Sequence, residues 1–506
     1  MKNKIKKLWL NSDIIVAVGC TILLAVTVLP FLYVAQYIWP SVDDFELSLW
    51  TKLAYQETGS IWRLLEEAIE YVKYKYMGWQ GAFSSIFLMA LQPGVWGDEY
   101  YWIGVILILV SLLLGVFLLT YVCMVKYGKT SRTTWLILCT LPTWSWFLRV
   151  MYTEEAFYWW TGASYYTGFH AWAMLMIAVA MCVWKDWERY GKIRRGLLTL
   201  LGGIACFFVG GGNYVSALML VLVLSGIALT AFCRQKGSKW VLSFWDFCTL
   251  AALLISVTAP GNTNHMNNDF QKDISVVEAI FIAIRDGLTD IRSWTNISVI
   301  MMFVFLLPFV WKLARGCSLK FRFPLLATVL SGGLYLAGYA PISYTFGGYP
   351  PGRMVNLFYW NYFWLLLFNV FYWVGWFQRK WESGSLQDKI EKMITVQNRW
   401  QPWYICVVGL LFLLSVCHIG VKNTNLYYIY GELSTGVYQK ADEFIKERVD
   451  YLTAHQGEEV ILEVLPYKSE ITYFGDLYPD KEHIVNTTMA EYYGVKSISI
   501  VGEEEK

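Results

Sequence analysis

Two adjacent carboxylates follow the first apolar run of the chain. Asp43 and Asp44, with Glu46 two residues on, come directly after a stretch that ends at Trp39 and is long enough to cross a bilayer. A carboxylate at such an exit is suited to act as a general base on a hydroxyl, or to hold a divalent cation such as Mg²⁺ or Mn²⁺ against a diphosphate. The alternative interpretation is that these acids only solvate a loop. Because Pro40 fixes the exit and the loop is otherwise aromatic, we favour a catalytic role for Asp43 and Asp44.

A second pair of acids lies among aromatic residues. Glu154 and Glu155 precede Trp159 in a stretch rich in Tyr and Trp. A sugar site needs aromatic faces for stacking and carboxylates that accept hydrogen bonds from hydroxyl groups. A belt of interfacial aromatics, as many membrane proteins have, explains the rings equally well. The acids at the membrane edge lead us to place Glu154, Glu155 and Trp159 among the candidate substrate-binding residues.

Arg353 is the single basic residue of the segment 341–353. A guanidinium group can grip a lipid-linked phosphate with two parallel hydrogen bonds. The alternative is an arginine that extends to lipid headgroups at the start of a span. Since Gly352 and two prolines precede it in a loop that is otherwise free of positive charge, the sequence favours phosphate binding.

Two glycine-containing turns complete the set of candidates. Gly210 to Gly212 and the turn Pro260-Gly261-Asn262 allow close backbone approach, although tight turns between spans account for both. Asn262 and the following His265 are added to the candidate substrate-binding residues. No nucleotide-binding loop is present, and His265 has no second metal ligand at helical spacing, so the sequence does not predict zinc.

The elements that position these residues are membrane spans. The chain is 56% hydrophobic and only 16% charged, which indicates an all-α polytopic membrane protein. Basic connectors alternate with connectors that are nearly free of Lys and Arg, which predicts about eleven spans with the N-terminus cytoplasmic and the C-terminus extracytoplasmic. The weakest span is 197–213, short and glycine-rich, which we expect to be broken or re-entrant. The predicted spans are 14–39, 101–125, 134–151, 169–184, 197–209, 214–233, 242–258, 294–311, 324–340, 354–377 and 402–420.

Two segments do not cross the membrane. The outer loop 39–100 contains an amphipathic helix that starts after Ser60, and a short apolar helix over 82–91. Residues 275–292 predict another surface helix. The predicted division is therefore a transmembrane domain over 1–420 and a small α/β extracytoplasmic region over 421–506, with a helix over 437–454 and strands over 459–465 and 497–501.

The chain resembles the GT-C superfamily of membrane glycosyltransferases. In particular, it is similar to a little-characterised group of bacterial membrane proteins near that superfamily. The resemblance covers most of the chain and depends on the order and common side of several short motifs. These are Asp43-Asp44-Phe45, Trp79-Gln80-Gly81, Glu155 to Trp159 with Gly162, Pro260-Gly261-Asn262, Gly352-Arg353, Asn486 and Tyr492-Tyr493-Gly494. The resemblance implies a catalytic base or metal-site residue in the first outer loop, where Asp43 and Asp44 match. No family-specific donor motif is present.

We therefore predict a multi-pass glycosyltransferase of a bacterial cell membrane. It would transfer a sugar from a polyprenyl-phosphate or polyprenyl-diphosphate carrier to a cell-envelope polysaccharide or glycolipid on the extracytoplasmic face, with inversion at the anomeric carbon. The partners would be the carrier lipid, the acceptor glycan and the bilayer, and nothing indicates nucleic acid. The alternatives are a flippase or transporter of lipid-linked glycans, and a polysaccharide polymerase or ligase. Acids that cluster at one face argue against transport, which favours ionisable residues near the bilayer midplane.

Overall fold

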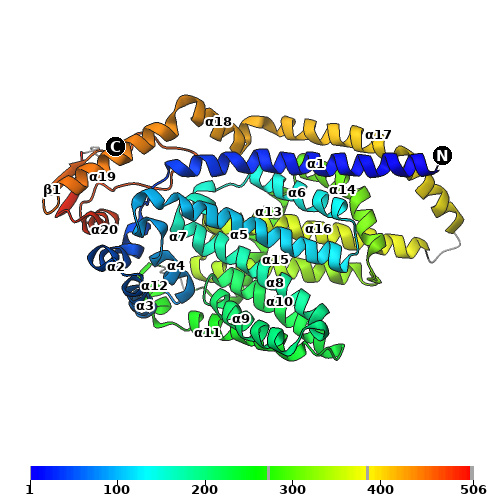
Figure 1. Ribbon diagram of the computed structural model, residues 1–506, viewed down its shortest axis with the longest axis horizontal. Helices are drawn as coiled ribbons and strands as arrows, with labels where there is room; N and C mark the ends of the chain where they lie inside the picture. Colours follow the sequence, from blue (N-terminus) through cyan, green and yellow to red (C-terminus); the bar gives the residue numbers. More distant parts are fainter. Residues whose placement is uncertain (1, 270–273, 383–386, 502–506) are drawn as a thin grey trace.

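A computed structural model describes residues 2–269, 274–382 and 387–501 of the chain. Ten helices in this described part are long and apolar enough to cross a membrane, so the protein is an all-α, multi-pass membrane protein. These helices run side by side along the length of the molecule (Figure 1). They are α1 (Lys2–Val34), α5 (Trp102–Tyr121), α8 (Phe169–Asp186), α9 (Lys192–Gly210), α10 (Tyr214–Cys233), α11 (Lys239–Val257), α14 (Ile297–Gly316), α15 (Pro324–Phe346), α16 (Gly352–Glu382) and α17 (Gln387–Gly420).

The eleventh predicted span, 134–151, corresponds to α6 (Arg132–Leu148), which has 17 residues. At about 1.5 Å per residue, α6 is shorter than the hydrocarbon core of a bilayer. It lies beside α1 and is buried along most of its length (Figure 1). The described part of the chain therefore has one fewer helix of spanning length than the sequence predicted.

The glycine-rich segment 197–213 does not form the broken span that the sequence suggested. Its first part is the continuous helix α9. Gly202 and Gly203 give this helix a close contact with α11, because a Cβ atom on Gly202 would lie 2.1 Å from the Trp245 ring and one on Gly203 2.5 Å from Phe244. The glycines of α9 therefore serve helix packing.

Short helices build one end of the molecule. The loop 39–100 forms α2 (Asp43–Thr58), α3 (Ile61–Gly78) and α4 (Phe83–Ala90), followed by turns of 3₁₀-helix at Pro93–Val95 and Asp98–Tyr100. The predicted amphipathic helix is α3, and Ser60 caps it by accepting a hydrogen bond from the Arg63 amide. Helix α12 (Pro260–Asp269) lies beside α3. Helix α13 (Val276–Trp294), predicted as a surface helix, packs along α15.

The chain beyond α17 forms a small α/β region at the same end (Figure 1). It contains α18 (Asn425–Thr435), α19 (Val437–Ala454), α20 (Ile484–Tyr493) and the parallel strands β1 (Glu459–Leu462) and β2 (Ser497–Ile500). The predicted helix over 437–454 and both strands are confirmed, with Val460 opposite Ile498. Phe45 and Leu49 of α2 join the apolar core of this region, which therefore docks on α2.

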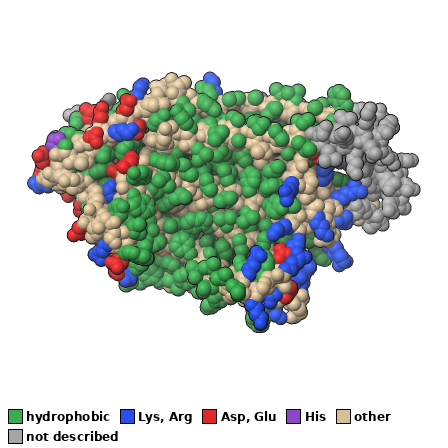
Figure 2. All heavy atoms as spheres, in the orientation of Figure 1, with side chains coloured by type: hydrophobic (Ala, Val, Ile, Leu, Met, Phe, Trp, Pro, Cys, Tyr) green, Lys and Arg blue, Asp and Glu red, His purple; other side chains and the backbone are tan. Residues whose placement is uncertain are grey.

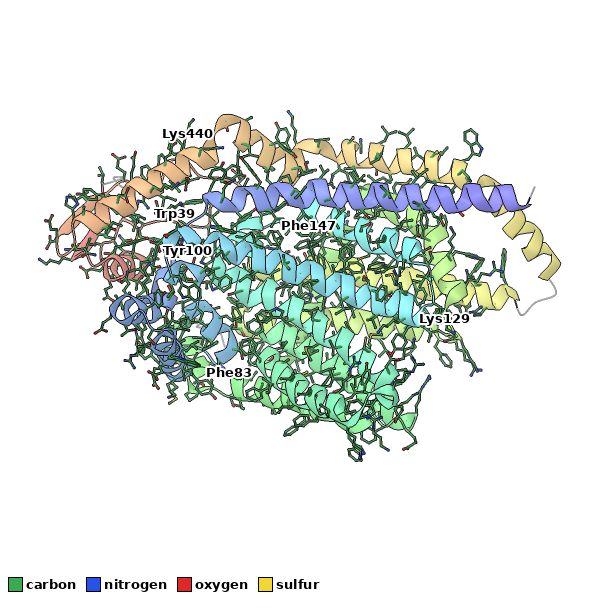
Figure 3. All side chains as sticks on the ribbon, in the orientation of Figure 1. Trp39, Phe83, Tyr100, Lys129, Phe147 and Lys440 are labelled. Atoms are coloured by element: carbon green, nitrogen blue, oxygen red, sulfur yellow. The ribbon has the colours of Figure 1, made fainter. Side chains whose placement is uncertain are left out.

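Charged side chains distinguish the two ends of the molecule. Figure 2 shows most Asp and Glu at the end that carries α2, α3 and the C-terminal region, and dense Lys and Arg at the opposite end. In Figure 3, Trp39, Phe83 and Tyr100 lie at the acidic end and Lys129 at the basic end. The segments that the sequence assigned to one side of the membrane therefore do lie together.

Candidate functional site

The backbone at the start of α2 sets the directions of Asp43 and Asp44. Val42, the residue before them, has φ of 50° and ψ of −114°, a conformation that β-branched residues rarely adopt. Gly475 of the C-terminal region packs against it, and a Cβ atom on Gly475 would lie 2.6 Å from Val42 Cγ2. A strained residue directly before a candidate catalytic acid is typical of functional sites, where the surroundings hold the strain in place.

Asp44 is fully buried, and its hydrogen-bonding capacity is filled. One carboxylate oxygen accepts from Tyr101 Oη (2.5 Å) and the Ser41 amide (3.2 Å), and the other accepts from the Thr161 amide (3.1 Å) and Thr161 Oγ1 (2.7 Å). Burial raises the pKa of Asp44 to about 6, although these donors oppose the shift. Four donors occupy the four acceptor positions of a carboxylate, so Asp44 joins α2 to the starts of α5 and α7 (Trp160–Ala163).

Asp43 is in a different state from its neighbour. Its side chain is half-buried, and no described residue donates a hydrogen bond to its carboxylate. Burial and the nearby Glu46 raise the pKa of Asp43, while the positive charges of Arg353 and Lys75 lower it. Asp43 therefore lies within electrostatic reach of two cations and keeps its acceptor positions available. Of the two predicted catalytic acids, the geometry favours Asp43.

The structure brings three predicted residues together near Asp43. Arg353 Nη1 lies 3.0 Å from Glu155 Oε2, and the guanidinium group lies 5.7 Å from the Trp159 ring centroid. On its other side the guanidinium group lies 5.6 Å from the Tyr166 ring, a residue that the sequence analysis did not select. Arg353 is 29% exposed, so one part of the guanidinium group is accessible to a ligand while a carboxylate and two rings orient it.

Glu154 lies apart from this group. Burial raises its pKa to about 7, and the neighbouring charges of Glu155 and Glu470 add to the effect. The C-terminal region also covers one face of Trp159, since the Phe474 ring stacks on it with centroids 3.7 Å apart and an angle of 9°. One face of the predicted sugar-stacking ring is therefore already occupied by this protein's own chain.

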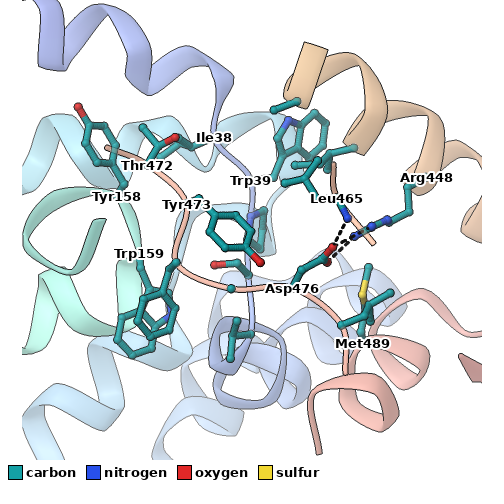
Figure 4. Close-up of a pocket in the computed structure, with 18 of the residues that line it drawn as sticks. Ile38, Trp39, Tyr158, Trp159, Arg448, Leu465, Thr472, Tyr473, Asp476 and Met489 are labelled. Carbon is teal, nitrogen blue, oxygen red and sulfur yellow. Dashed lines mark hydrogen bonds and ion pairs between the residues drawn. The ribbon is translucent and has the colours of Figure 1, made fainter. Parts of the chain in front are cut away.

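A cavity lies between the α1–α2 junction and the C-terminal loop, with Trp159 and Tyr473 in its wall (Figure 4). Its volume of about 80 Å³ is enough for several water molecules. The ion pair between Arg448 and Asp476, with atoms 2.6 Å apart, and the hydrogen bond from the Leu465 amide to Asp476 close one side (Figure 4). The C-terminal region therefore packs tightly against this part of the membrane domain.

The side-chain amide of Asn262 forms hydrogen bonds to several segments of the protein itself. Its Oδ1 accepts from the Gly81 amide and Tyr214 Oη, both at 3.0 Å, and its Nδ2 donates to the Ser256 and Val257 carbonyls at 2.7 and 2.9 Å. The motifs Trp79-Gln80-Gly81 and Pro260-Gly261-Asn262, which are far apart in the sequence, thus meet here. Asn262 fixes the end of α3 against α12. His265 lies in α12, and its side chain is outside the described residues.

An apolar cavity of about 520 Å³ begins next to the Arg353 group. Tyr166, which contacts the Arg353 guanidinium, and Met354 form part of its wall. Gln80 and Asn262 add polar groups, and α10, α11, α13 and α15 supply the rest. Two wall residues, Val257 and Val276, are 54% and 65% exposed, so the cavity reaches the apolar outer surface of the helix bundle. An opening of this kind would admit a lipid chain from a surrounding bilayer.

Two ion pairs near the site were absent from the sequence-based candidates. Lys75 of α3 pairs with Glu46 of α2 beside Asp43. Lys52 of α2 and Asp98, both less than 9% exposed, pair at 3.0 Å. The sequence could have suggested Glu46 as a site residue, because it lies three residues after Asp43 and therefore on the same face of α2.

Among the described residues, no group of three or more His, Cys, Asp or Glu side chains is arranged to hold a metal ion. The carboxylate oxygens of Asp44 are occupied by hydrogen-bond donors, so a cation at Asp43 would need ligands from a substrate. No protein-family model matches the chain, and no curated protein and no solved structure matches it significantly.

Proposed function

We propose that this protein is a membrane glycosyltransferase that moves a sugar from a polyprenyl-phosphate or polyprenyl-diphosphate carrier to a cell-envelope polysaccharide or glycolipid. The observation that carries the proposal is the position of Arg353 at the wall of an apolar cavity that reaches the outer surface of the helix bundle, with Asp43 within electrostatic reach of the Arg353 charge. A lipid-linked sugar needs these three features together: an apolar path for the lipid, a cation for the phosphate and a base for the acceptor hydroxyl.

The chemistry assigns one task to each group. Asp43 accepts the proton of the acceptor hydroxyl as its oxygen attacks the anomeric carbon. The bond between that carbon and the phosphate oxygen breaks, and the phosphate leaves with the electron pair. Arg353 stabilises the negative charge that develops on the phosphate. Direct displacement inverts the anomeric configuration, and we assign Glu154 and Glu155 to bind sugar hydroxyls, whereas Trp159 is buried under Phe474.

The proposal places the acidic end of the molecule on the extracytoplasmic side of a bacterial membrane. The dense Lys and Arg at the opposite end support this orientation, since positive charge favours the cytoplasmic side. The donor then enters laterally from the outer leaflet through the apolar cavity, without a soluble nucleotide sugar.

The same cavity also fits a second candidate, a flippase of lipid-linked glycans, because a lateral opening between spans serves translocation as well as binding. A polymerase or ligase would use the same site on a longer glycan.

The deciding experiment measures envelope glycan composition in cells that lack the protein and are complemented with wild type, Asp43→Asn or Arg353→Ala. We expect wild type alone to restore a missing sugar, while both variants insert in the membrane at normal levels. Restoration by Asp43→Asn would favour the flippase, and restoration by both variants would refute the proposed site.

A further inference from the structure

Arg353 has a counterpart in Lys75, since both positive charges act on Asp43. Lys75 Nζ forms an ion pair with Glu46, and it lies 4.8 Å from the Trp79 ring centroid and 5.5 Å from that of Tyr71. Arg353 is likewise paired with one carboxylate and flanked by two aromatic rings. The two arrangements come from different elements, α3 and α16, and both lie within electrostatic reach of Asp43.

The fold fixes Lys75 firmly in this position. Lys75 is 8% exposed and lies one turn before the Trp79-Gln80-Gly81 segment, which Gly261 contacts closely: a Cβ atom on Gly261 would lie 2.7 Å from the Trp79 amide nitrogen. Burial of a lysine is costly unless the charge is paired, so a lysine kept at this place needs a reason. A purely apolar contact between α2 and α3 would not require it.

We propose that Lys75 is a second phosphate-binding residue, and that the carrier is therefore a polyprenyl diphosphate. This inference rests on the proposed function and selects between the two carriers that the proposed function leaves open. A sugar-linked diphosphate carries one negative charge on each phosphate, and Arg353 and Lys75 supply one positive charge for each. Asp43, within electrostatic reach of both cations, then lies near the phosphate that leaves.

The proposal has a consequence for the two carboxylates. Glu155 and Glu46 hold Arg353 and Lys75 when no lipid is bound, and each must yield its cation when the diphosphate enters. Removing the charge of Glu46 should therefore tighten diphosphate binding, because Lys75 no longer has a competing partner. A role for the Lys75–Glu46 pair in stability alone predicts no such gain.

The test measures the binding of farnesyl phosphate and farnesyl diphosphate to the purified full-length protein in lipid nanodiscs. We expect wild type to prefer the diphosphate by about tenfold, the factor expected for one additional charge-assisted hydrogen bond. Lys75→Met should abolish this preference and leave monophosphate affinity unchanged, whereas Arg353→Met should weaken both lipids. Lys73→Met is the matched control, since Lys73 pairs with Glu70 on the exposed face of the same helix.

Glu46→Gln is a second test that does not depend on the stability of Lys75→Met. We expect this variant to bind the diphosphate more tightly than wild type. The inference is overturned if Lys75→Met changes neither lipid or both equally, or if Glu46→Gln gives no gain. Equal affinity of wild type for the monophosphate and the diphosphate would refute only this inference. Absence of binding of either lipid to wild type would refute the carrier-lipid function as well.

Discussion

The two regions around Asp43 and Asp98 are built from similar side chains and differ in one respect. Asp98 is 7% exposed and accepts hydrogen bonds from Lys52, Tyr492 and Tyr493, each at 3.0 Å. Asp43 also has a lysine, an arginine and aromatic rings nearby, yet its carboxylate receives no hydrogen bond from a described residue. One carboxylate has all its partners within the protein, and the other has cations within reach but no bonded partner.

This difference separates a structural acid from a candidate catalytic acid better than residue type does. A buried carboxylate with a full set of donors stabilises the fold, since removing any donor leaves an unpaired polar group. A half-buried carboxylate without donors gains little from the fold, and its raised pKa shows that folding disfavours its charge. The variants below test this contrast.

The largest effect is expected for Asp43→Asn. Loss of a general base typically lowers the rate by about 10²- to 10⁴-fold, so glycan restoration in complemented cells should fall to about a hundredth of wild type or less. The melting temperature of the purified variant should not fall, because Asp43 makes no hydrogen bond that asparagine would lose. A clear loss of stability would place Asp43 with the structural acids.

Lys52→Met should have the largest effect on stability. It removes one partner of a buried ion pair and leaves Asp98 charged and incompletely paired, which costs about 3 kcal/mol or more in the free energy of unfolding. Denaturant unfolding of the detergent-solubilised protein measures the change. Lys73→Met, whose partner is exposed, serves as the control and should stay within about 0.5 kcal/mol of wild type.

Glu154 is intermediate between Asp98 and Asp43, and it should make the stability of the protein depend on pH. Its pKa of about 7 exceeds the ordinary 4.5, so the folded chain binds the proton more tightly than the unfolded chain. The free energy of unfolding should therefore rise as the pH falls from about 7 to 4.5, by no more than about 1.4 kcal/mol per pH unit. Melting temperatures across this range should lose part of their slope in Glu154→Gln. An unchanged slope would show that the carboxylate is well solvated.

Tyr493→Phe should have the smallest effect. It removes one of the three donors to Asp98 and leaves the ring in place, which costs about 1 kcal/mol. A decrease in melting temperature smaller than that of Lys52→Met is the expected result. If the two variants had equal effects, the lysine charge would contribute no more than a neutral hydroxyl group.

The sequence predicted the helical membrane class, the helices α3 and α4 and the two short strands, because each depends on local periodicity. It missed α20, although His483 at the N-cap and Gly494, with φ of 77°, at the C-terminal end are recognisable signals. The sequence predicted no helix between the strands over 459–465 and 497–501. The apolar side of α20 packs against α2, which lies far earlier in the chain, so local periodicity did not reveal this helix.

For the candidate site, the sequence selected residues that lie together in the structure, but it did not predict the individual states of these residues. Arg353, Glu155 and Trp159 do lie together near Asp43, because their segments share one side of the membrane. The distinction between Asp43 and Asp44 depends on the Val42 backbone and on Thr161, 117 residues away. Local patterns carry no information about such distant donors.

The Lys52–Asp98 pair has a consequence for biosynthesis. The ribosome makes Lys52 and Asp98 early, whereas Tyr492 and Tyr493, which complete the environment of Asp98, emerge only after α17. Helix α2, which carries both Lys52 and Asp43, therefore gains these contacts only after the ten described helices of spanning length have been made. The site that we propose would then be completed late in translation.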